Sequence, residues 1–479
     1  MPFTSALPTR PWYRRVLNYK SGRATDTMKS PQNRTLTQKA LGAGGWSMLG
    51  QVISQVARLG GNLVMTRLLV PEMFGIAAIA VMVPVVLALL SDIGLGQNIV
   101  QSRRGEDPLF LDTAWVVQIV RGGVLWLMAL AVSFALQLAS KWGLFPVDSV
   151  YASPILPVVV AVSSFSVVIA GLASTRMATA LRRFEQKRYI QIELASQLAG
   201  ILVMFSIGIA FHSIWALVAA GLVSSLISTL LSHFWMGGHP NRFRWDKSAL
   251  RELVGFGKWI FISSAVYVLA VNGDRILLGG FVDARMLGLY VIAASMIGAL
   301  EGAFGRLLNV VCLPVFSEIA RNDESRLRAA YYKMRVPGDL ALLFAGGLLY
   351  ACGHLLIDLL YDQRYVAAGA MLQILALSLV VVRYGVAHQI YLALGLPRNL
   401  AIINGVRLFS LYALVPALYY LAGLQAAIWA IALHGIPTVM VIFAMNAKLG
   451  LNDFRRETLV LAAVPAGYFC GLAVNMVHA

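Results

Sequence analysis

Residues 73–90 read MFGIAAIAVMVPVVLALL and contain no charged or hydrogen-bonding side chain. A helix of about 20 such residues crosses the hydrocarbon layer of a bilayer. Runs of this kind recur along the whole chain: of its 479 residues, 59% are hydrophobic and 13% are charged. Soluble domains carry about 25% charged residues. The composition therefore excludes a soluble enzyme and predicts an all-α integral membrane protein.

Apolar runs like this one predict thirteen spans, and a long basic linker separates two groups of six. The first 40 residues are basic and too polar to bury a core of their own. The expected domains are a disordered basic cytoplasmic tail at 1–40, an N-lobe of spans 1–6 at 41–236, a cytoplasmic linker at 237–254, a C-lobe of spans 7–12 at 255–447 and an additional C-terminal span at 448–479. The spans lie at about 46–68, 73–98, 113–139, 150–175, 190–212, 214–236, 255–281, 286–312, 337–360, 366–394, 399–421, 424–447 and 457–477.

Basic residues are distributed unevenly between the alternating loops. The net charge is +17, and 29 of the 39 basic residues fall on one side of the predicted membrane while four fall on the other. Loops rich in Lys and Arg stay in the cytoplasm. The bias predicts a cytoplasmic N-terminus, and it accounts for the positive charge without a nucleic-acid partner.

A short internal repeat relates the two groups of spans. Residues 73–76 (MFGI) resemble residues 286–289 (MLGL) at an offset of 213 positions, and each copy precedes a fresh apolar run. Six spans separate the copies, so both halves have the same orientation. Parallel repeats of this kind are related by an axis along the membrane normal.

Six arginines remain inside predicted spans, where a charge needs a water-filled cavity or a partner. Guanidinium groups bind phosphate in a bidentate geometry, so an arginine-lined cavity suits an anionic substrate. For the deep arginines the alternative is a buried pair with an acid of the other lobe. Arg306 and Arg275 lie near span ends and could instead reach the headgroups. The candidate substrate-binding residues are Arg58, Arg383, Arg121, Arg407 and Arg275.

The sequence offers few residues for ion coupling, metal binding or catalysis. Glu301 is the acid nearest mid-membrane, and it is predicted to be either a proton or sodium site or the partner of an arginine. The sequence contains no phosphate-binding loop, no HExxH and no close histidine pair. We therefore expect no metal, no catalytic residues and no cofactor apart from possible H⁺ or Na⁺ coupling.

Several short motifs between residues 45 and 400 follow one another in the same order as in a known protein family. They are TRLLVPEMFG at 66–75, DIGLG at 92–96, WAL at 215–217, GDRILLG at 273–279, GLY at 288–290, PVFS at 314–317, LQILA at 372–376 and LGLPR at 394–398. In this series the chain resembles the polysaccharide transporters (Wzx-type oligosaccharide-lipid flippases) of the MOP flippase superfamily.

The resemblance implies two six-helix lobes around a central cationic cavity, with one or two extra C-terminal helices. It also implies movement of undecaprenyl-pyrophosphate-linked oligosaccharide units across the bacterial inner membrane, for exopolysaccharide, capsule or O-antigen synthesis. Membrane lipids and polysaccharide polymerase or export machinery would be its partners. The rival functions are a peptidoglycan-precursor flippase, a cation or drug antiporter and a membrane-embedded polymerase. Short outer loops disfavour the polymerase, because such an enzyme generally needs a large periplasmic loop.

Overall fold

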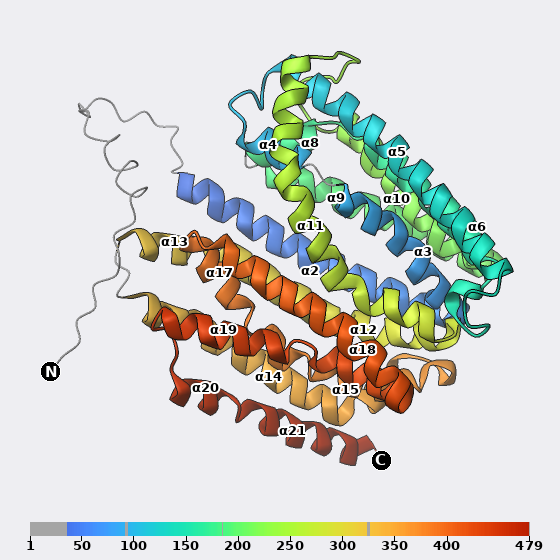
Figure 1. Ribbon diagram of the computed structural model, residues 1–479, viewed down its shortest axis with the longest axis vertical. Coiled ribbons are helices and arrows are strands. Elements are labelled where there is room, and N and C mark those ends of the chain that lie inside the picture. The colour runs from blue at the N-terminus through green and yellow to red at the C-terminus, as the bar shows by residue number, and fades with distance from the viewer. Residues whose placement is uncertain (1–35, 92–93, 184, 323–325, 479) are drawn as a thin grey trace. The chain divides into compact units, whose positions relative to one another are not determined.

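The computed structural model describes residues 36–91, 94–183, 185–322 and 326–478, and its elements are helical throughout these ranges (Figure 1). Residues 43–479 group as one compact unit. The predicted tail at 1–40 lies almost wholly outside the described residues, and helix α2 already begins at Leu36.

The helices of the first half end at the linker before α11. They are α2 (Leu36–Leu68), α3 (Pro71–Leu90), α4 (Leu95–Gln101), α5 (Pro108–Lys141), η1 (Val150–Ala152), α6 (Leu156–Ser163), α7 (Phe165–Gly171), α8 (Arg176–Arg182), α9 (Gln186–Phe211) and α10 (Trp215–Phe234).

The second half contains the longest helices of the chain. Its elements are α11 (Lys247–Phe281), α12 (Ala284–Leu307), the π-helical turn η2 (Leu308–Cys312), α13 (Leu313–Asn322), α14 (Leu327–Leu360), η4 (Gln363–Tyr365), α15 (Ala368–Ala376), α16 (Leu379–Val382), α17 (Gly385–Ala393), α18 (Pro397–Leu433), α19 (Ile436–Lys448), α20 (Phe454–Val460) and α21 (Ala463–His478).

Within the described residues, nine helical segments are long and apolar enough to cross a membrane, or ten when the bent segment made of α6, α7 and α8 is included. The thirteen predicted spans exceed this number for two reasons. The segment Pro397–Lys448 counts once although Gly423 breaks it with a φ of 77°. In addition, α2 and α11 occupy the first and seventh predicted spans but are not among the nine. All thirteen predictions therefore fall on helical segments.

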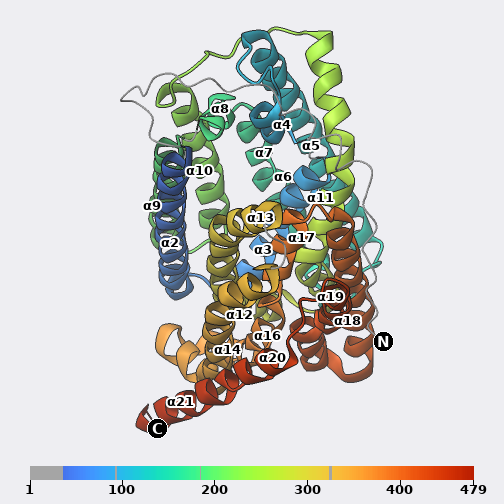
Figure 2. The same cartoon turned by 90° about the vertical axis from the view of Figure 1, so that its left-hand side faces the viewer.

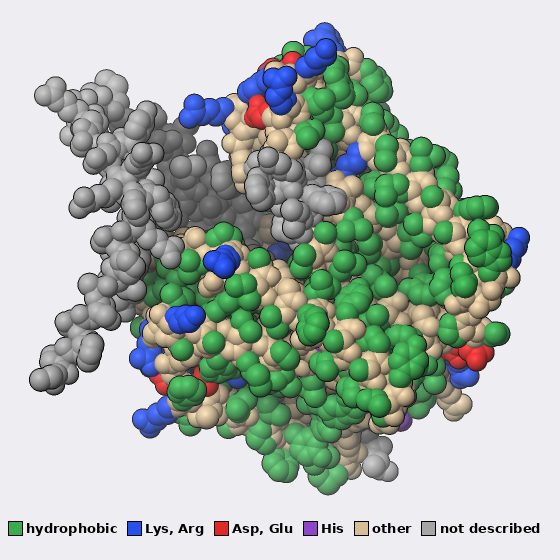
Figure 3. All heavy atoms as spheres, in the orientation of Figure 1, with side chains coloured by type: hydrophobic (Ala, Val, Ile, Leu, Met, Phe, Trp, Pro, Cys, Tyr) green, Lys and Arg blue, Asp and Glu red, His purple; other side chains and the backbone are tan. Residues whose placement is uncertain are grey.

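The surface of these helices is that of a membrane protein. Hydrophobic side chains cover most of the face in Figure 3, while Lys and Arg gather mainly toward its upper and left edges. Among the exposed large side chains are Val56, Leu127 and Leu202 in the middle of their helices. Exposed apolar residues in such numbers fit a hydrocarbon solvent rather than water.

The two repeats meet where α3 crosses α12. A Cβ added to Gly75 would lie 2.0 Å from the carbonyl oxygen of Ala284, and one added to Gly288 would lie 1.8 Å from that of Pro71. Residues 71 and 75 correspond to residues 284 and 288 at the repeat offset of 213. The contact is therefore reciprocal, as a two-fold axis requires. Only glycine permits two backbones to approach this closely.

Helix α11 joins the two lobes (Figure 2). Its start is capped by Asp246, whose carboxylate accepts from the backbone N–H groups of Ser248 and Ala249. Ala249 and Leu253 are buried against α4 and α5 of the first lobe. Farther along, α11 packs on α3 of the first lobe and on α18 of the second lobe. The predicted seventh span is thus the second part of a longer connecting helix.

Candidate functional site

A polar stripe lies between the lobes on α2. Gln51, Gln55, Arg58 and Asn62 recur at helical spacing on one face, because positions three or four apart are neighbours on a helix. The guanidinium of Arg306 on α12 donates to Gln51 Oε1 at 2.8 Å, which shows that this face meets the second lobe. We call these five residues the inter-lobe stripe.

The two arginines of the inter-lobe stripe are bound by neutral groups. Arg58 donates to the side-chain oxygen of Gln55 and is exposed. Arg306 donates to Gln51, and its Nε is buried without a hydrogen-bond partner among the described residues. A buried donor that lacks an acceptor is costly. An anionic group placed between α2 and α12 would supply that acceptor and balance both charges. Sequence reasoning nominated Arg58 but favoured a headgroup role for Arg306.

Arg121, another predicted site residue, lies elsewhere in the first lobe. Its guanidinium donates to Ser91 Oγ at 3.1 Å and to the carbonyl of Ala88, at the end of α3. Gln118, one turn away, donates to three carbonyls at the end of α7. Both side chains line a pocket of about 320 Å³ inside the lobe. In this conformation Arg121 satisfies a carbonyl in the last turn of α3.

Arg275, Arg407 and Glu301 come together inside the second lobe, from α11, α18 and α12. Glu301 interacts electrostatically with Arg407 and Asp274 and is hydrogen-bonded by Ser378. Arg407 Nε lies 3.3 Å from His434 Nε2. The hydroxyl of Tyr290 donates to Asp274. Two acids and two arginines balance in this C-lobe cluster, so its interior is less cationic than the arginine inventory alone indicates.

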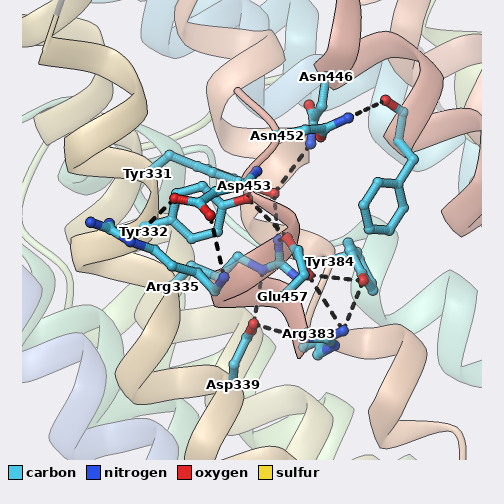
Figure 4. A network of polar contacts seen from close by, with 12 residues as sticks. Tyr331, Tyr332, Arg335, Asp339, Arg383, Tyr384, Asn446, Asn452, Asp453 and Glu457 are labelled. Carbon is cyan, nitrogen blue, oxygen red and sulfur yellow. Dashed lines mark hydrogen bonds and ion pairs between the residues drawn. The ribbon is translucent and has the colours of Figure 1, made fainter. Parts of the chain in front are cut away.

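Arg383 belongs to a buried ion network rather than to the inter-lobe stripe (Figure 4). Its guanidinium donates to Asp339 Oδ2 at 3.0 Å and lies 3.5 Å from Glu457 Oε2. Arg335 lies 3.0 Å from the same Asp339 oxygen and donates to Glu457 Oε2 at 2.9 Å. Two arginines and two carboxylates compensate one another. The structure thus places Arg383 in a buried pair, and its partner acids come from its own lobe and the C-terminal helices, not from the opposite lobe.

Aromatic hydroxyls complete the ion network. Tyr384 accepts from Arg383 at 2.8 Å and donates to Glu457 at 3.1 Å. Tyr332 donates to Glu457 at 3.2 Å and accepts from the backbone N–H of Asp453 at 2.8 Å. The network therefore fastens α20 to α14 and to the α16–α17 segment. Sequence reasoning missed Arg335, which it placed in a loop; the spacing of Arg335 and Asp339 as i and i+4 was the available signal.

A second set of contacts closes the lobes at the end predicted to face outward. Arg364, between α14 and α15, donates to the carbonyls of Thr66 and Arg67 at 3.1 and 3.2 Å. The Nε of Arg364 also donates to Asp362 Oδ2 at 3.0 Å. The buried Tyr365 donates to Leu69 O at 2.9 Å. We call Arg67, Asp362, Arg364 and Tyr365 the outer clasp, because they bind the α2–α3 loop of one lobe to the other lobe.

Acid–base chemistry at the outer clasp follows from this geometry. Hydrogen bonds from Arg364 hold the pKa of Asp362 below its usual range. The same contact raises the pKa of Arg364. Both groups are therefore charged at neutral pH, as a charge-assisted clasp requires.

Two helical lobes, crossed at paired glycines and carrying arginines between them, define a two-lobed membrane transporter fold. The chain belongs to the polysaccharide biosynthesis protein family, whose model matches residues 64–370. Among curated relatives, the lipopolysaccharide biosynthesis protein WzxC of Escherichia coli K12 is 22% identical over 347 residues, which cover 71% of this chain and 67% of WzxC.

Solved structures share the fold at low sequence identity. The lipid II flippase MurJ in an inward closed conformation is 13% identical, with a TM-score of 0.68 over 89% of this chain and 92% of MurJ. An inward-facing multidrug resistance MATE transporter of the MOP superfamily is 13% identical, with a TM-score of 0.59 over 84% and 98% of the two chains. The predicted MOP-like, all-helical membrane fold and the predicted family are confirmed.

Proposed function

We propose that this protein is a flippase for undecaprenyl-pyrophosphate-linked oligosaccharide units in the bacterial inner membrane, with its N-terminus in the cytoplasm. Its task is transport rather than catalysis. The observation that carries the proposal is the inter-lobe stripe, where Arg58 on α2 and Arg306 on α12 each donate to a glutamine side chain of α2. A pyrophosphate offers the acceptors that these two guanidinium groups need. Membership of the polysaccharide biosynthesis family supports an oligosaccharide cargo.

In this mechanism the described conformation is closed toward the outside. The outer clasp and the crossing of Gly75 with Gly288 hold the outer ends of the lobes together. The pyrophosphate enters between α2 and α12 from the inner side, while the lipid tail stays in the bilayer. Rocking of one lobe against the other then opens the outer end. Polysaccharide polymerase or export machinery would receive the released unit.

Energy coupling is assigned to the C-lobe cluster. Glu301 interacts electrostatically with Arg407 and with Asp274, and Ser378 lies beside it. A proton or sodium ion taken up by this cluster would change its charge balance and its packing between α11, α12 and α18. In Glu301→Gln, we expect transport that no longer responds to the gradient, measured as uptake of labelled lipid-linked cargo into proteoliposomes with and without an imposed pH or sodium gradient. A gradient response as large as that of the wild-type protein would remove Glu301 from the coupling step.

The first experiment is analysis of extracted lipids from a deletion strain by mass spectrometry, together with an assay of surface polysaccharide. Accumulation of intact lipid-linked oligosaccharide with loss of surface polymer would support the proposed flippase and identify the cargo. Normal surface polymer with new drug sensitivity would contradict it and indicate an antiporter.

Variants of the inter-lobe stripe test the site itself. Each charge lost should weaken pyrophosphate binding by about tenfold to a hundredfold, because a hydrogen bond to a charged group contributes about 1.5–3 kcal/mol. We therefore expect Arg58→Gln and Arg306→Gln each to reduce export of the oligosaccharide at normal protein levels. Arg398→Gln is the matched control, since Arg398 is an exposed arginine at the start of α18. Equal export by all three variants would exclude the stripe as the substrate site.

A further inference from the structure

A groove separates α14 from α20 on the side of the second lobe away from the inter-lobe stripe. It encloses about 460 Å³. Its walls are largely apolar and include Val336, Pro337 and Leu459. Two cations, Lys333 on α14 and Arg456 on α20, and the ring of Tyr332 complete it. Figures 1 and 2 both place α20 and α21 at the edge of the helices, against α14.

The groove has an excess of positive charge that the protein does not neutralise. Lys333 is exposed and makes no ion pair with any described residue. Arg456 lies 3.4 Å from Asp453, but Asp453 is shared with Arg328 at 3.8 Å. The nearest other acid, Glu457, is committed to Arg335 and Arg383 in the ion network. Arg456 also lies over the ring of Tyr332, with its guanidinium carbon 5.5 Å from the ring centre. Because Asp453 balances only one of its two arginines, Lys333 and the shared charge of Arg456 can still attract an anion from outside the protein.

The backbone of α14 is interrupted beside the same groove. Pro337 lies inside the helix. Because proline has no backbone N–H, it cannot donate to the carbonyl of residue 333, four positions earlier. The proline therefore removes one of the usual hydrogen bonds of the helix beside the groove. An apolar wall and two cations together match an acyl chain joined to a phosphate headgroup.

The location of the groove identifies its occupant as a membrane lipid. Arg456 lies in the first turn of the membrane segment Phe454–Val477 and Lys333 in the second turn of Leu327–Leu360, near the segment ends, where basic side chains meet the headgroup layer. Basic pockets between transmembrane helices on the cytoplasmic side bind anionic headgroups. The groove is built by α14 and α20, whereas the inter-lobe stripe is built by α2 and α12.

We propose that the groove between α14 and α20 binds one anionic phospholipid, with its phosphate between Lys333 and Arg456 and an acyl chain along Val336 and Leu459. The lipid fastens the C-terminal helices to the lobe. Tyr332 forms part of the groove wall, and its hydroxyl bonds Glu457 and the backbone of Asp453. A lipid seated against Tyr332 therefore supports the ion network that holds α20 to α14.

Native mass spectrometry of the full-length protein tests this binding with phosphatidylglycerol and phosphatidylethanolamine as probes. We expect a retained phosphatidylglycerol adduct, and an unfolding temperature that rises with phosphatidylglycerol but not with phosphatidylethanolamine. The double variant Lys333→Gln/Arg456→Gln should bind phosphatidylglycerol about thirtyfold more weakly, since each basic residue near an anionic surface contributes to binding. Lys247→Gln/Arg251→Gln removes two exposed charges from the start of α11 and should leave the adduct intact.

A steric variant keeps the test independent of charge. Val336→Trp fills the groove while preserving Lys333 and Arg456, and it should abolish both the adduct and the rise in unfolding temperature. Three outcomes would overturn the proposal: equal binding of the zwitterionic lipid, unchanged binding in both groove variants, or an adduct in the groove that proves to be a polyprenyl pyrophosphate rather than a phospholipid.

Discussion

At the scale of single residues, the environment of an arginine separates a structural role from a binding role. Arg383 and Arg335 are buried and each contacts two carboxylates. Arg58 and Arg306 contact glutamine side chains instead. An arginine that is already paired with carboxylates attracts an anionic substrate only weakly. An arginine bonded to neutral amides keeps its net positive charge and attracts the anion more strongly. The hydrogen-bond partners of each arginine, rather than the depth of that arginine in the membrane, therefore indicate which arginines form the candidate site.

Arg383→Ala should destabilise the protein by about 3–5 kcal/mol, because it leaves Asp339 and Glu457 with only Arg335 to balance two buried charges. Thermal or denaturant unfolding of the purified protein measures this loss. Adding Asp339→Asn should recover part of it by removing the charge that is left unpaired. Unchanged stability in Arg383→Ala would show that the ion network does not hold the helices together.

At the scale of elements, the outer clasp should respond to acid. The pKa of Asp362 is lowered by its hydrogen bonds with Arg364, so the carboxylate stabilises the clasp above its unfolded pKa of about 3.9. That contribution is lost as the pH falls through the lower pKa of the folded state. We expect the outer end to loosen below about pH 4, measured by hydrogen exchange in residues 360–370. Asp362→Asn should be loose already at pH 7 and insensitive to acid.

Helix positions could be read from the sequence more reliably than helix ends. Each predicted apolar run falls on a helical segment of the structure, because hydrocarbon excludes unpaired backbone groups. Pro337, however, was read as the start of the ninth span, whereas α14 begins at Leu327 and carries the proline inside it. That error moved Arg335 into a loop and hid the ion network. Glu457 could not be paired with Arg383 from sequence either, because the two are far apart along the chain and meet only through packing of α20 on α14.

At the scale of the whole molecule, the internal repeat predicted from four residues marks the contact between the lobes. Gly75 and Gly288 each approach a backbone carbonyl of the opposite helix, so the outer ends of α3 and α12 can meet only if both positions lack a side chain. The outer clasp binds the neighbouring loops at the same end. Contact between the lobes at the end predicted to face outward thus depends on a steric condition in the crossing and on hydrogen bonds in the clasp. The two can be separated by mutation.

Gly288→Val should prevent the outer end from closing, because its Cβ would lie 1.8 Å from the carbonyl oxygen of Pro71. A reporter cysteine at Ile79, which is 3% exposed and one turn along α3 from Gly75, should then react with a membrane-impermeant maleimide in intact cells. Native Cys312, Cys352 and Cys470 are replaced beforehand. Gly298→Val is the matched control, since Gly298 lies on the same helix with no atom within 4 Å of an added Cβ. Labelling that rises in Gly288→Val and stays low in Gly298→Val would establish the crossing as the outer gate. Equal labelling of the two variants would assign closure to the clasp alone.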